Sequence, residues 1–243
     1  MIIFSDLDGT LLDRDTYSYA QAVPAMAHLR ERGIPLVLVT SKTRAEVAAL
    51  REKMGNTDPF IVENGGAVLI PGAADLVLGA SSGQARQALA HAASQTGVRV
   101  RGFGSMTVEE ISRHSGLQPD VAALAAQREY GEPFVLLEGE PADLEAALNA
   151  QGFQMTQGGR FFHVLGGCDK ARAVLALAER QNEADTVGLG DAPNDIGFLR
   201  AVRRPIIIPS PHLDAMRAAL PHAEVAPAPG PAGWNQVVLR VIG

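Results

Sequence analysis

Short apolar runs alternate with stretches of helical periodicity in the first quarter of the chain. The apolar runs have the length of strands, and the residues between them place apolar side chains at helical spacing. Thr43 and Glu46 form a capping box at the start of the second helical stretch. The elements predicted here are strands at residues 2–4, 36–39 and 60–62 and helices at residues 21–32 and 43–54. This order is typical of βαβ units with buried, parallel strands.

The same rhythm returns in the last third of the chain. It predicts a helix over 170–180, a strand over 186–189, a short helix after Asn194 and a strand over 205–208. We expect both ends of the chain to share one doubly wound, mostly parallel sheet, which makes the fold class α/β. Residues 226–232 are too rich in proline to continue a helix and are predicted to form a loop.

The middle of the chain has a different pattern. Polar and apolar residues alternate in some of its predicted strands, as they do in an antiparallel sheet with one solvated face. Gly158 and Gly159 are a turn signal between two of these strands. The elements predicted here are strands near 98–101, 134–137 and 161–164 and helices over 107–115, 119–129 and 141–150. We therefore predict a core domain of residues 1–80 and 167–243 and an inserted α+β domain of residues 81–166.

Composition and charge narrow the kinds of partner. Of 243 residues, 47% are hydrophobic, and the formal net charge is −6. This balance argues against a nucleic acid or an acidic membrane as partner, because both require a basic face. The single Cys168 cannot form an internal disulfide, and residues 1–4 show no leader signal, so we expect a cytoplasmic protein. No apolar run approaches the roughly 20 residues that span a bilayer.

Two acidic segments each follow a predicted strand. They are Asp6-Leu7-Asp8-Gly9-Thr10 and Gly190-Asp191-Ala192-Pro193-Asn194-Asp195. Parallel strands end at one edge of a sheet, where open α/β folds bind ligands, so these carboxylates can meet there. Clustered carboxylates need protons or a cation between them, and a hard divalent ion such as Mg²⁺ is the usual solution. The alternative interpretations are an Asp-rich turn and a helix N-cap at Asn194 or Asp195, which would leave Asp191 unexplained.

Two further residues have the chemistry of a phosphate site. Thr40 ends a predicted strand with a hydroxyl group, and Lys170 opens a predicted helix with a compact positive charge. Taken alone, Thr40 is a strand-end hydroxyl and Lys170 a solvated surface lysine. Their order relative to the acidic segments favours a magnesium-assisted phosphoryl-transfer site.

With these four motifs in this order, the chain resembles the haloacid dehalogenase-like (HAD) phosphatase superfamily. The resemblance implies that Asp6 is a nucleophile that forms an aspartyl-phosphate and that Asp8 is the general acid and base. It implies that Thr40 and Lys170 hold the phosphoryl oxygens. The metal ligands that it implies for Mg²⁺ are Asp6, the Asp8 carbonyl, Asp191 and, directly or through a neighbouring ligand, Asp195. The insertion resembles the α+β cap of the sugar-phosphatase branch.

Several further strings are similar to the mannosyl-3-phosphoglycerate phosphatase family of that branch. They are Thr40-Ser41-Lys42-Thr43-Arg44, Phe60-Ile61-Val62-Glu63-Asn64-Gly65-Gly66, Arg128-Glu129-Tyr130-Gly131-Glu132 and Gly158-Gly159-Arg160-Phe161-Phe162-His163. This resemblance implies hydrolysis of mannosyl-3-phosphoglycerate to mannosylglycerate and phosphate. The substrate-binding candidates are Ser41, Lys42, Asn64, Gly65, Gly66, Arg128, Arg160, His163 and Asn194. Each also has a structural interpretation, as a helix approach, a turn, a solvated face or core cover.

Other functions remain open at this point. A glucosyl-3-phosphoglycerate phosphatase or a general sugar-phosphate phosphatase would keep the core motifs and differ in the inserted domain. A receiver-like signalling domain would be a single compact domain. The long stretch of sequence between Thr40 and Lys170 fits such a domain poorly. A non-catalytic sugar-phosphate-binding protein would be expected to lack Asp6, Asp8 or Lys170. The expected partner is a small phosphorylated sugar-glycerate, and the sequence leaves the oligomeric state open.

Overall fold

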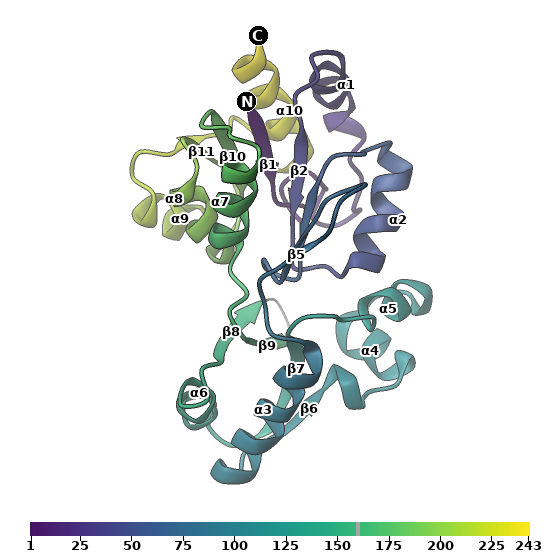
Figure 1. Ribbon diagram of the computed structural model, residues 1–243, viewed down its shortest axis with the longest axis vertical. Helices are drawn as coiled ribbons and strands as arrows, with labels where there is room; N and C mark the ends of the chain where they lie inside the picture. The colour runs from purple at the N-terminus through teal and green to yellow at the C-terminus, as the bar shows by residue number, and fades with distance from the viewer. Residues whose placement is uncertain (159–160) are drawn as a thin grey trace.

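The computed structural model describes residues 1–158 and 161–243 and contains two β-sheets (Figure 1). The larger sheet has eight strands in the order β12-β11-β10-β1-β2-β3-β4-β5. Its strands are β1 (Ile2–Ser5), β2 (Leu36–Val39), β3 (Phe60–Val62), β4 (Ala67–Leu69), β5 (Leu76–Val77), β10 (Thr186–Gly190), β11 (Arg204–Ile207) and β12 (Glu224–Val225). The six strands from β12 to β3 are parallel, and β4 and β5 continue the sheet as an antiparallel meander. The predicted doubly wound, mostly parallel α/β fold is confirmed.

Helices cover both faces of the larger sheet, because side chains alternate along its buried strands. Ile3 faces a core that includes Leu29 and Trp234, whereas Phe4 faces a second core that includes Leu177 and Phe198. The helices of the first face are α1 (Val23–Glu31), α2 (Arg44–Met54) and α10 (Gly230–Ile242), and those of the second are α7 (Lys170–Arg180), α8 (Ile196–Ala201) and α9 (Leu213–Ala219). Figure 1 shows these two groups on either side of β1 and β2.

The smaller sheet is antiparallel, in the order β6-β7-β9-β8. Its strands are β6 (Arg99–Gly102), β7 (Glu132–Glu138), β8 (Gln154–Gly158) and β9 (Phe161–Leu165), and its helices are α3 (Ser82–Thr96), α4 (Val108–Ser115), α5 (Pro119–Ala125) and α6 (Pro141–Asn149). Phe134 of β7 packs with Leu89 of α3 and Leu144 of α6 in a core separate from those of the larger sheet. In Figure 1 these elements form the lower half of the molecule.

The two passages between the halves lie side by side. The amide of Ala80 on the outgoing chain donates to the carbonyl of Gly166 on the returning chain, at 2.6 Å.

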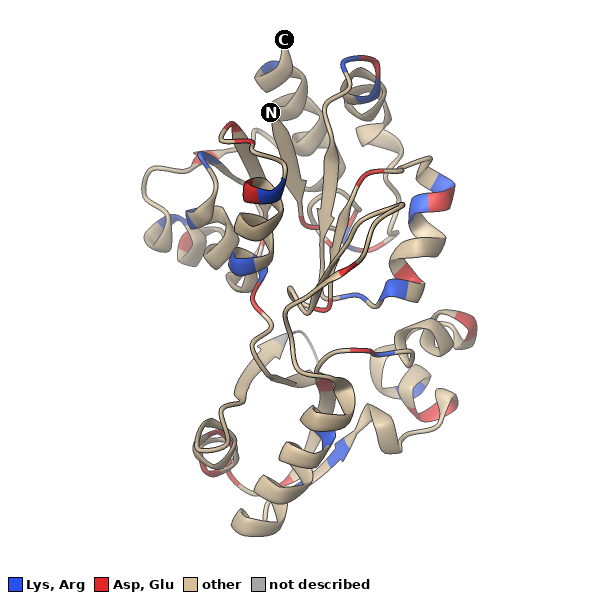
Figure 2. Ribbon diagram, in the orientation of Figure 1, with Lys and Arg blue, Asp and Glu red and all other residues tan. Residues whose placement is uncertain are grey.

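Lysine, arginine, aspartate and glutamate are interspersed on the helices of both halves (Figure 2).

Two boundary predictions were wrong. Helix α5 ends at Ala125, not near residue 129, because the backbone amides of Glu129 and Tyr130 donate to the Glu63 carboxylate of the core half. Residues 230–232 belong to α10, not to a loop. Pro231 lies in the first turn of α10, where a missing amide hydrogen removes no helical hydrogen bond.

Candidate active site

The two acidic segments meet because β1 and β10 are neighbours in the larger sheet. The strands are parallel and in register from Ile2 beside Thr186 to Ser5 beside Leu189. The amide of Asp6 then donates to the carbonyl of Leu189 at 2.9 Å. The acidic residues that follow both strands therefore lie at one carboxyl edge of the sheet, as the sequence predicts.

Lys170 is the first residue of α7 and lies between two carboxylates. Its Nζ atom is 2.8 Å from Asp6 Oδ1 and 2.7 Å from Asp195 Oδ1. Burial by itself lowers the pKa of Lys170, but Asp195 and Asp6 outweigh it and raise that pKa above its ordinary value. Lys170 is therefore a permanent positive charge, and only 4% of the residue is exposed. The alternative of a solvated surface lysine is excluded.

Asp6, Asp191 and Asp195 form a buried carboxylate triad. One carboxylate oxygen from each lies within 4.8 Å of the other two. Burial, and then repulsion from Asp195, raise the pKa of both Asp6 and Asp191 above the ordinary value. The amides of Asp191 and Ala192 both donate to Asp195 Oδ2 at 3.1 Å, which fixes that side chain. A compact set of hard, mutually repelling oxygens fits a divalent cation such as Mg²⁺.

Three residues that the sequence analysis did not select hold Asp191. Thr10 Oγ1 donates to Asp191 Oδ1 at 3.1 Å, and Arg14 lies 2.6 Å from Asp191 Oδ2. Ser210 Oγ donates to the Asp191 carbonyl at 2.6 Å. Thr10 belongs to the first acidic motif, and Ser210 follows β11 at the same sheet edge. Their positions in the sequence could therefore have identified both as candidates. Arg14 lies in an irregular loop, and its position carried no such signal.

Asp8 lies beside this triad and contacts a different cation. Its Oδ2 atom is 2.9 Å from Lys42 Nζ, and its buried Oδ1 has no hydrogen-bond partner among the described residues. Burial lowers the pKa of Lys42, but Asp8 and Glu46 outweigh burial and raise that pKa overall. Thr40 is buried at the end of β2, and its hydroxyl oxygen accepts from the Lys42 amide at 3.2 Å. Lys42 therefore lies next to Asp8 and Thr40, two of the predicted catalytic residues.

A cavity of about 240 Å³ opens from this cluster toward the smaller sheet. Its lining includes predicted residues of both halves, namely Ser41, Asn64, His163, Lys170 and Asn194. It also includes Gln154, Thr156 and Gln157 of β8, which the sequence analysis did not select. Buried Asn64 Oδ1 and His163 Nδ1 have no hydrogen-bond partner in the part of the chain that the structure describes. Burial, and then Arg128, lower the pKa of His163 to about 3, so its imidazole is neutral.

Three of the remaining predicted residues, Gly65, Gly66 and Arg128, lie against protein groups. Gly65 has a φ of +89°, and a Cβ atom there would lie 2.2 Å from the carbonyl oxygen of Asp169, directly before Lys170. Gly66 allows similarly close packing of Tyr130. Arg128 contacts Glu63 and the Ser41 carbonyl. Arg160 lies outside the described residues.

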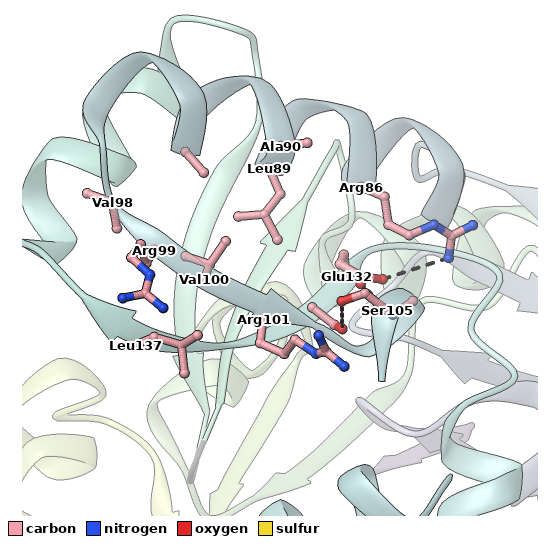
Figure 3. A pocket seen from close by; sticks show the side chains of 13 residues that line it. Arg86, Leu89, Ala90, Val98, Arg99, Val100, Arg101, Ser105, Glu132 and Leu137 are labelled. Atoms are coloured by element: carbon pink, nitrogen blue, oxygen red, sulfur yellow. Dashed lines mark hydrogen bonds and ion pairs between the residues drawn. The ribbon is translucent and has the colours of Figure 1, made fainter. Parts of the chain in front are cut away.

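A larger cavity, of about 540 Å³, lies elsewhere, between α3 and β6 of the smaller sheet (Figure 3). Arg86, Arg101, Ser105 and Glu132 lie around it together with apolar side chains. None of its lining residues belongs to the Asp6 cluster. The candidate site is therefore identified by the convergence of charged side chains and not by the size of the cavity.

Comparison with known proteins shows which family this chain resembles. Residues 3–94 match the family model of haloacid dehalogenase-like hydrolases. A glucosyl-3-phosphoglycerate/mannosyl-3-phosphoglycerate phosphatase of Persephonella marina is 40% identical over 100% of this chain and 97% of its own length. A mannosyl-3-phosphoglycerate phosphatase of Pyrococcus furiosus is 36% identical over 83% of this chain and 88% of its own length.

Solved structures share the fold. A haloacid dehalogenase-like hydrolase from Bacteroides thetaiotaomicron superposes with a TM-score of 0.75 at 16% identity, covering 99% of this chain and 98% of its own. Among the described residues, no helix is both long and apolar enough to cross a bilayer. Sequence identities above 35% over most of the chain assign it to a narrower family than the shared fold does. The chain belongs to the mannosyl-3-phosphoglycerate phosphatase family of haloacid dehalogenase-like hydrolases and is a phosphoric monoester hydrolase.

Proposed function

We propose that this protein is a Mg²⁺-dependent phosphatase that hydrolyses mannosyl-3-phosphoglycerate to mannosylglycerate and phosphate. The observation that carries the proposal is the contact of buried Lys170 with both Asp6 and Asp195, which brings a cation and the carboxylates together at one sheet edge. The names of the relatives from P. marina and P. furiosus support the substrate class. The glucosyl analogue is the second candidate substrate, because the P. marina relative is named for both sugars.

The carboxylate triad supports the choice of metal. Asp6, Asp191 and Asp195 would hold Mg²⁺, together with the backbone carbonyl of Asp8, and Thr10 and Arg14 orient Asp191 through its two carboxylate oxygens. When bound, Mg²⁺ supplies positive charge that offsets the developing negative charge of phosphoryl transfer. The remaining chemistry belongs to side chains of this chain.

In the first step, a carboxylate oxygen of Asp6 attacks phosphorus, and the bond from phosphorus to the glycerate oxygen breaks. Asp8 gives its proton to that oxygen, so the product leaves as an alcohol. Lys170 and Thr40 hold the other phosphoryl oxygens by charge and by hydrogen bonding. The result is an aspartyl-phosphate on Asp6 and an ionised Asp8.

In the second step, Asp8 takes a proton from a water molecule, whose oxygen attacks the phosphorus atom. The bond from phosphorus to the Asp6 carboxylate breaks and releases inorganic phosphate. Asp6 is restored as a carboxylate and Asp8 as an acid. The proton that Asp8 loses in the first step thus returns in the second, so the two steps balance.

The cavity toward the smaller sheet is the proposed site of the sugar-glycerate group. Asn64 and His163 have unused hydrogen-bonding atoms there, and neutral groups of this kind suit sugar hydroxyls. Ser41, Lys42 and Asn194 are the proposed ligands nearer the phosphate, with Lys42 next to the substrate carboxylate. In this proposal residues 81–166 act as a cap on a core of residues 1–80 and 167–243.

The experiment that tests this function is phosphate release, with Mg²⁺ present, from mannosyl-3-phosphoglycerate, glucosyl-3-phosphoglycerate and mannose phosphates. Asp6→Asn is the blank, since it keeps the shape of the side chain and removes the nucleophile. A preference for the mannosyl substrate supports the proposal. Equal or faster turnover of mannose phosphates would replace it with a general sugar-phosphate phosphatase. The absence of turnover of every ester would favour a binding protein.

A further inference from the structure

Glu63 is a buried carboxylate that binds the smaller half of the molecule to the core. It follows β3, is fully buried and has a φ of +49°. Glu63 Oε1 accepts from the Glu129 amide at 2.8 Å, and Oε2 accepts from the Tyr130 amide at 3.0 Å. Both amides belong to the segment between α5 and β7. One core side chain thus fixes the backbone of a segment 66 residues away.

Arg128 completes this contact and extends it to the loop of Thr40, Ser41 and Lys42. Its Nε atom donates to Glu63 Oε2 at 3.1 Å, and its two terminal nitrogens donate to the Ser41 carbonyl, each at 3.2 Å. The Arg128 side chain is 7% exposed. All three of its nitrogens therefore have protein partners, and Arg128 faces the backbone directly after Thr40.

The backbone of Glu63 and Asn64 binds the same loop. The Glu63 amide donates to the Lys42 carbonyl at 3.0 Å, and the Asn64 amide donates to the Thr40 carbonyl at 2.9 Å. The carbonyls of Thr40, Ser41 and Lys42 are thus all held by Glu63, Asn64 or Arg128. A rigid loop matters here because phosphoryl transfer depends on placing donors accurately around the phosphate.

We propose that Glu63 and Arg128 are positioning residues for the reaction. Their buried ion pair holds the loop of Thr40, Ser41 and Lys42 in the geometry that receives a phosphoryl group. Arg128 acts through the Ser41 carbonyl and does not touch substrate. The inference relies on the proposed function only for the choice of natural substrate, because any phosphate ester that reacts at Asp6 uses the same loop.

The test compares wild type with Arg128→Lys and Glu63→Gln, on the proposed substrate and on para-nitrophenyl phosphate, at a temperature well below every unfolding midpoint. Lysine keeps the charge beside Glu63, but its donors all sit on one nitrogen and cannot reproduce the planar fork with which Arg128 reaches both Glu63 and the Ser41 carbonyl. We expect kcat to fall about tenfold or more on both esters, because small displacements of catalytic groups are costly. We also expect the inhibition constant for inorganic phosphate to rise in the same variants, because the loop would bind phosphate less tightly. If a single variant does not fold, the double variant Glu63→Gln/Arg128→Met is used in its place. It removes both charges and leaves no unpaired buried ion.

Arg44→Met is the matched control. Arg44 also joins the halves, through Glu129, and it pairs with Asp75 within the core half. Among the described residues its side chain forms no hydrogen bond with the loop backbone, and its pairs are partly exposed. Its kcat and phosphate inhibition should equal those of wild type. The proposal is overturned if the variants of Glu63 and Arg128 lose only thermal stability while kcat and phosphate inhibition stay unchanged. If wild type hydrolyses para-nitrophenyl phosphate but not the phosphoglycerates, the proposed substrate fails, and the positioning role is still tested.

Discussion

Lys42 Nζ forms an ion pair with Asp8 Oδ2 across 2.9 Å, between the loop after β2 and the loop after β1. The proposed general acid therefore has a cationic partner of its own, separate from the lysine that contacts Asp6. This separation gives the two aspartates of the first acidic motif different surroundings, since Asp6 contacts Lys170 and Asp8 contacts Lys42. Two chemically identical side chains can thus take different roles.

Asp8→Asn should retain metal binding and lose most turnover. Asparagine has the shape of aspartate but no proton to give, and loss of general acid and base catalysis typically costs about 10²–10⁴-fold in rate. The Asp8 side chain lies outside the carboxylate triad, so calorimetric titration with Mg²⁺ should be close to that of wild type. Asp15→Asn, in an exposed part of the same loop, is the control. Activity like that of wild type in Asp8→Asn would exclude the acid and base role.

Lys170→Met should destabilise the protein, and Mg²⁺ should recover part of the loss. The variant leaves Asp6 and Asp195 without their shared cation, and breaking a buried pair typically costs about 3–5 kcal/mol. Urea unfolding with and without Mg²⁺ measures both effects. Exposed Lys53→Met should change neither value. A loss of stability in Lys170→Met that Mg²⁺ does not reduce would show that the triad does not bind the ion.

Stabilisation by Mg²⁺ should grow as pH rises. Burial and Asp195 raise the folded-state pKa of Asp6 and Asp191, so without metal the folded protein holds protons that the unfolded chain has lost. The stability from these groups is therefore present below the unfolded pKa and falls as pH rises through the raised folded values. Mg²⁺ requires the ionised carboxylates, so protons compete with it.

Thermal unfolding with and without Mg²⁺, from about pH 5 to about pH 8, measures this competition across the range where acidic side chains with raised pKa ionise. The shift in midpoint caused by Mg²⁺ should be larger at the higher pH. Asp191→Asn removes one ligand and should reduce the shift at every pH. A shift that is independent of pH in wild type would contradict binding by Asp6 and Asp191.

His163→Gln should make stability less sensitive to acid. Burial and Arg128 lower the pKa of His163 to about 3 in the folded protein, so its contribution to stability is present above the ordinary histidine pKa. That contribution is lost as pH falls toward the folded value, by about 2 kcal/mol at about pH 5. Urea unfolding at neutral and acidic pH should show a smaller difference for His163→Gln than for wild type. His114→Gln, at an exposed position, should behave as wild type.

Local signals predicted most of the larger sheet and the charged centre of the site. The capping box at Thr43 starts α2, and Lys170 starts α7, as expected. Asp6 and Asp191 each follow a buried strand, so the sheet edge could be inferred from the apolar runs before them. These features depend on neighbours in sequence, which is why one sequence was sufficient to predict them.

Features that depend on distant residues were not predicted. The end of α5 is set by Glu63, and the contact of Arg14 with Asp191 joins residues 177 positions apart. The polar side chains of β8 become candidate ligands only because they line one cavity together with Lys170. No periodicity or local motif carries that information, since it arises when the two halves come together.

The neighbouring positions of β1 and β10 also constrain how the chain folds. Strand β1 is synthesised before its partner β10, and β10, Asp191 and Asp195 emerge more than 180 residues after it. Until then one side of β1 is an unpaired strand edge, and such edges favour aggregation. Contacts between residues so distant in sequence also slow folding. A growing chain therefore cannot assemble the carboxylate triad, or show phosphatase activity, before Asp191 and Asp195 have been synthesised.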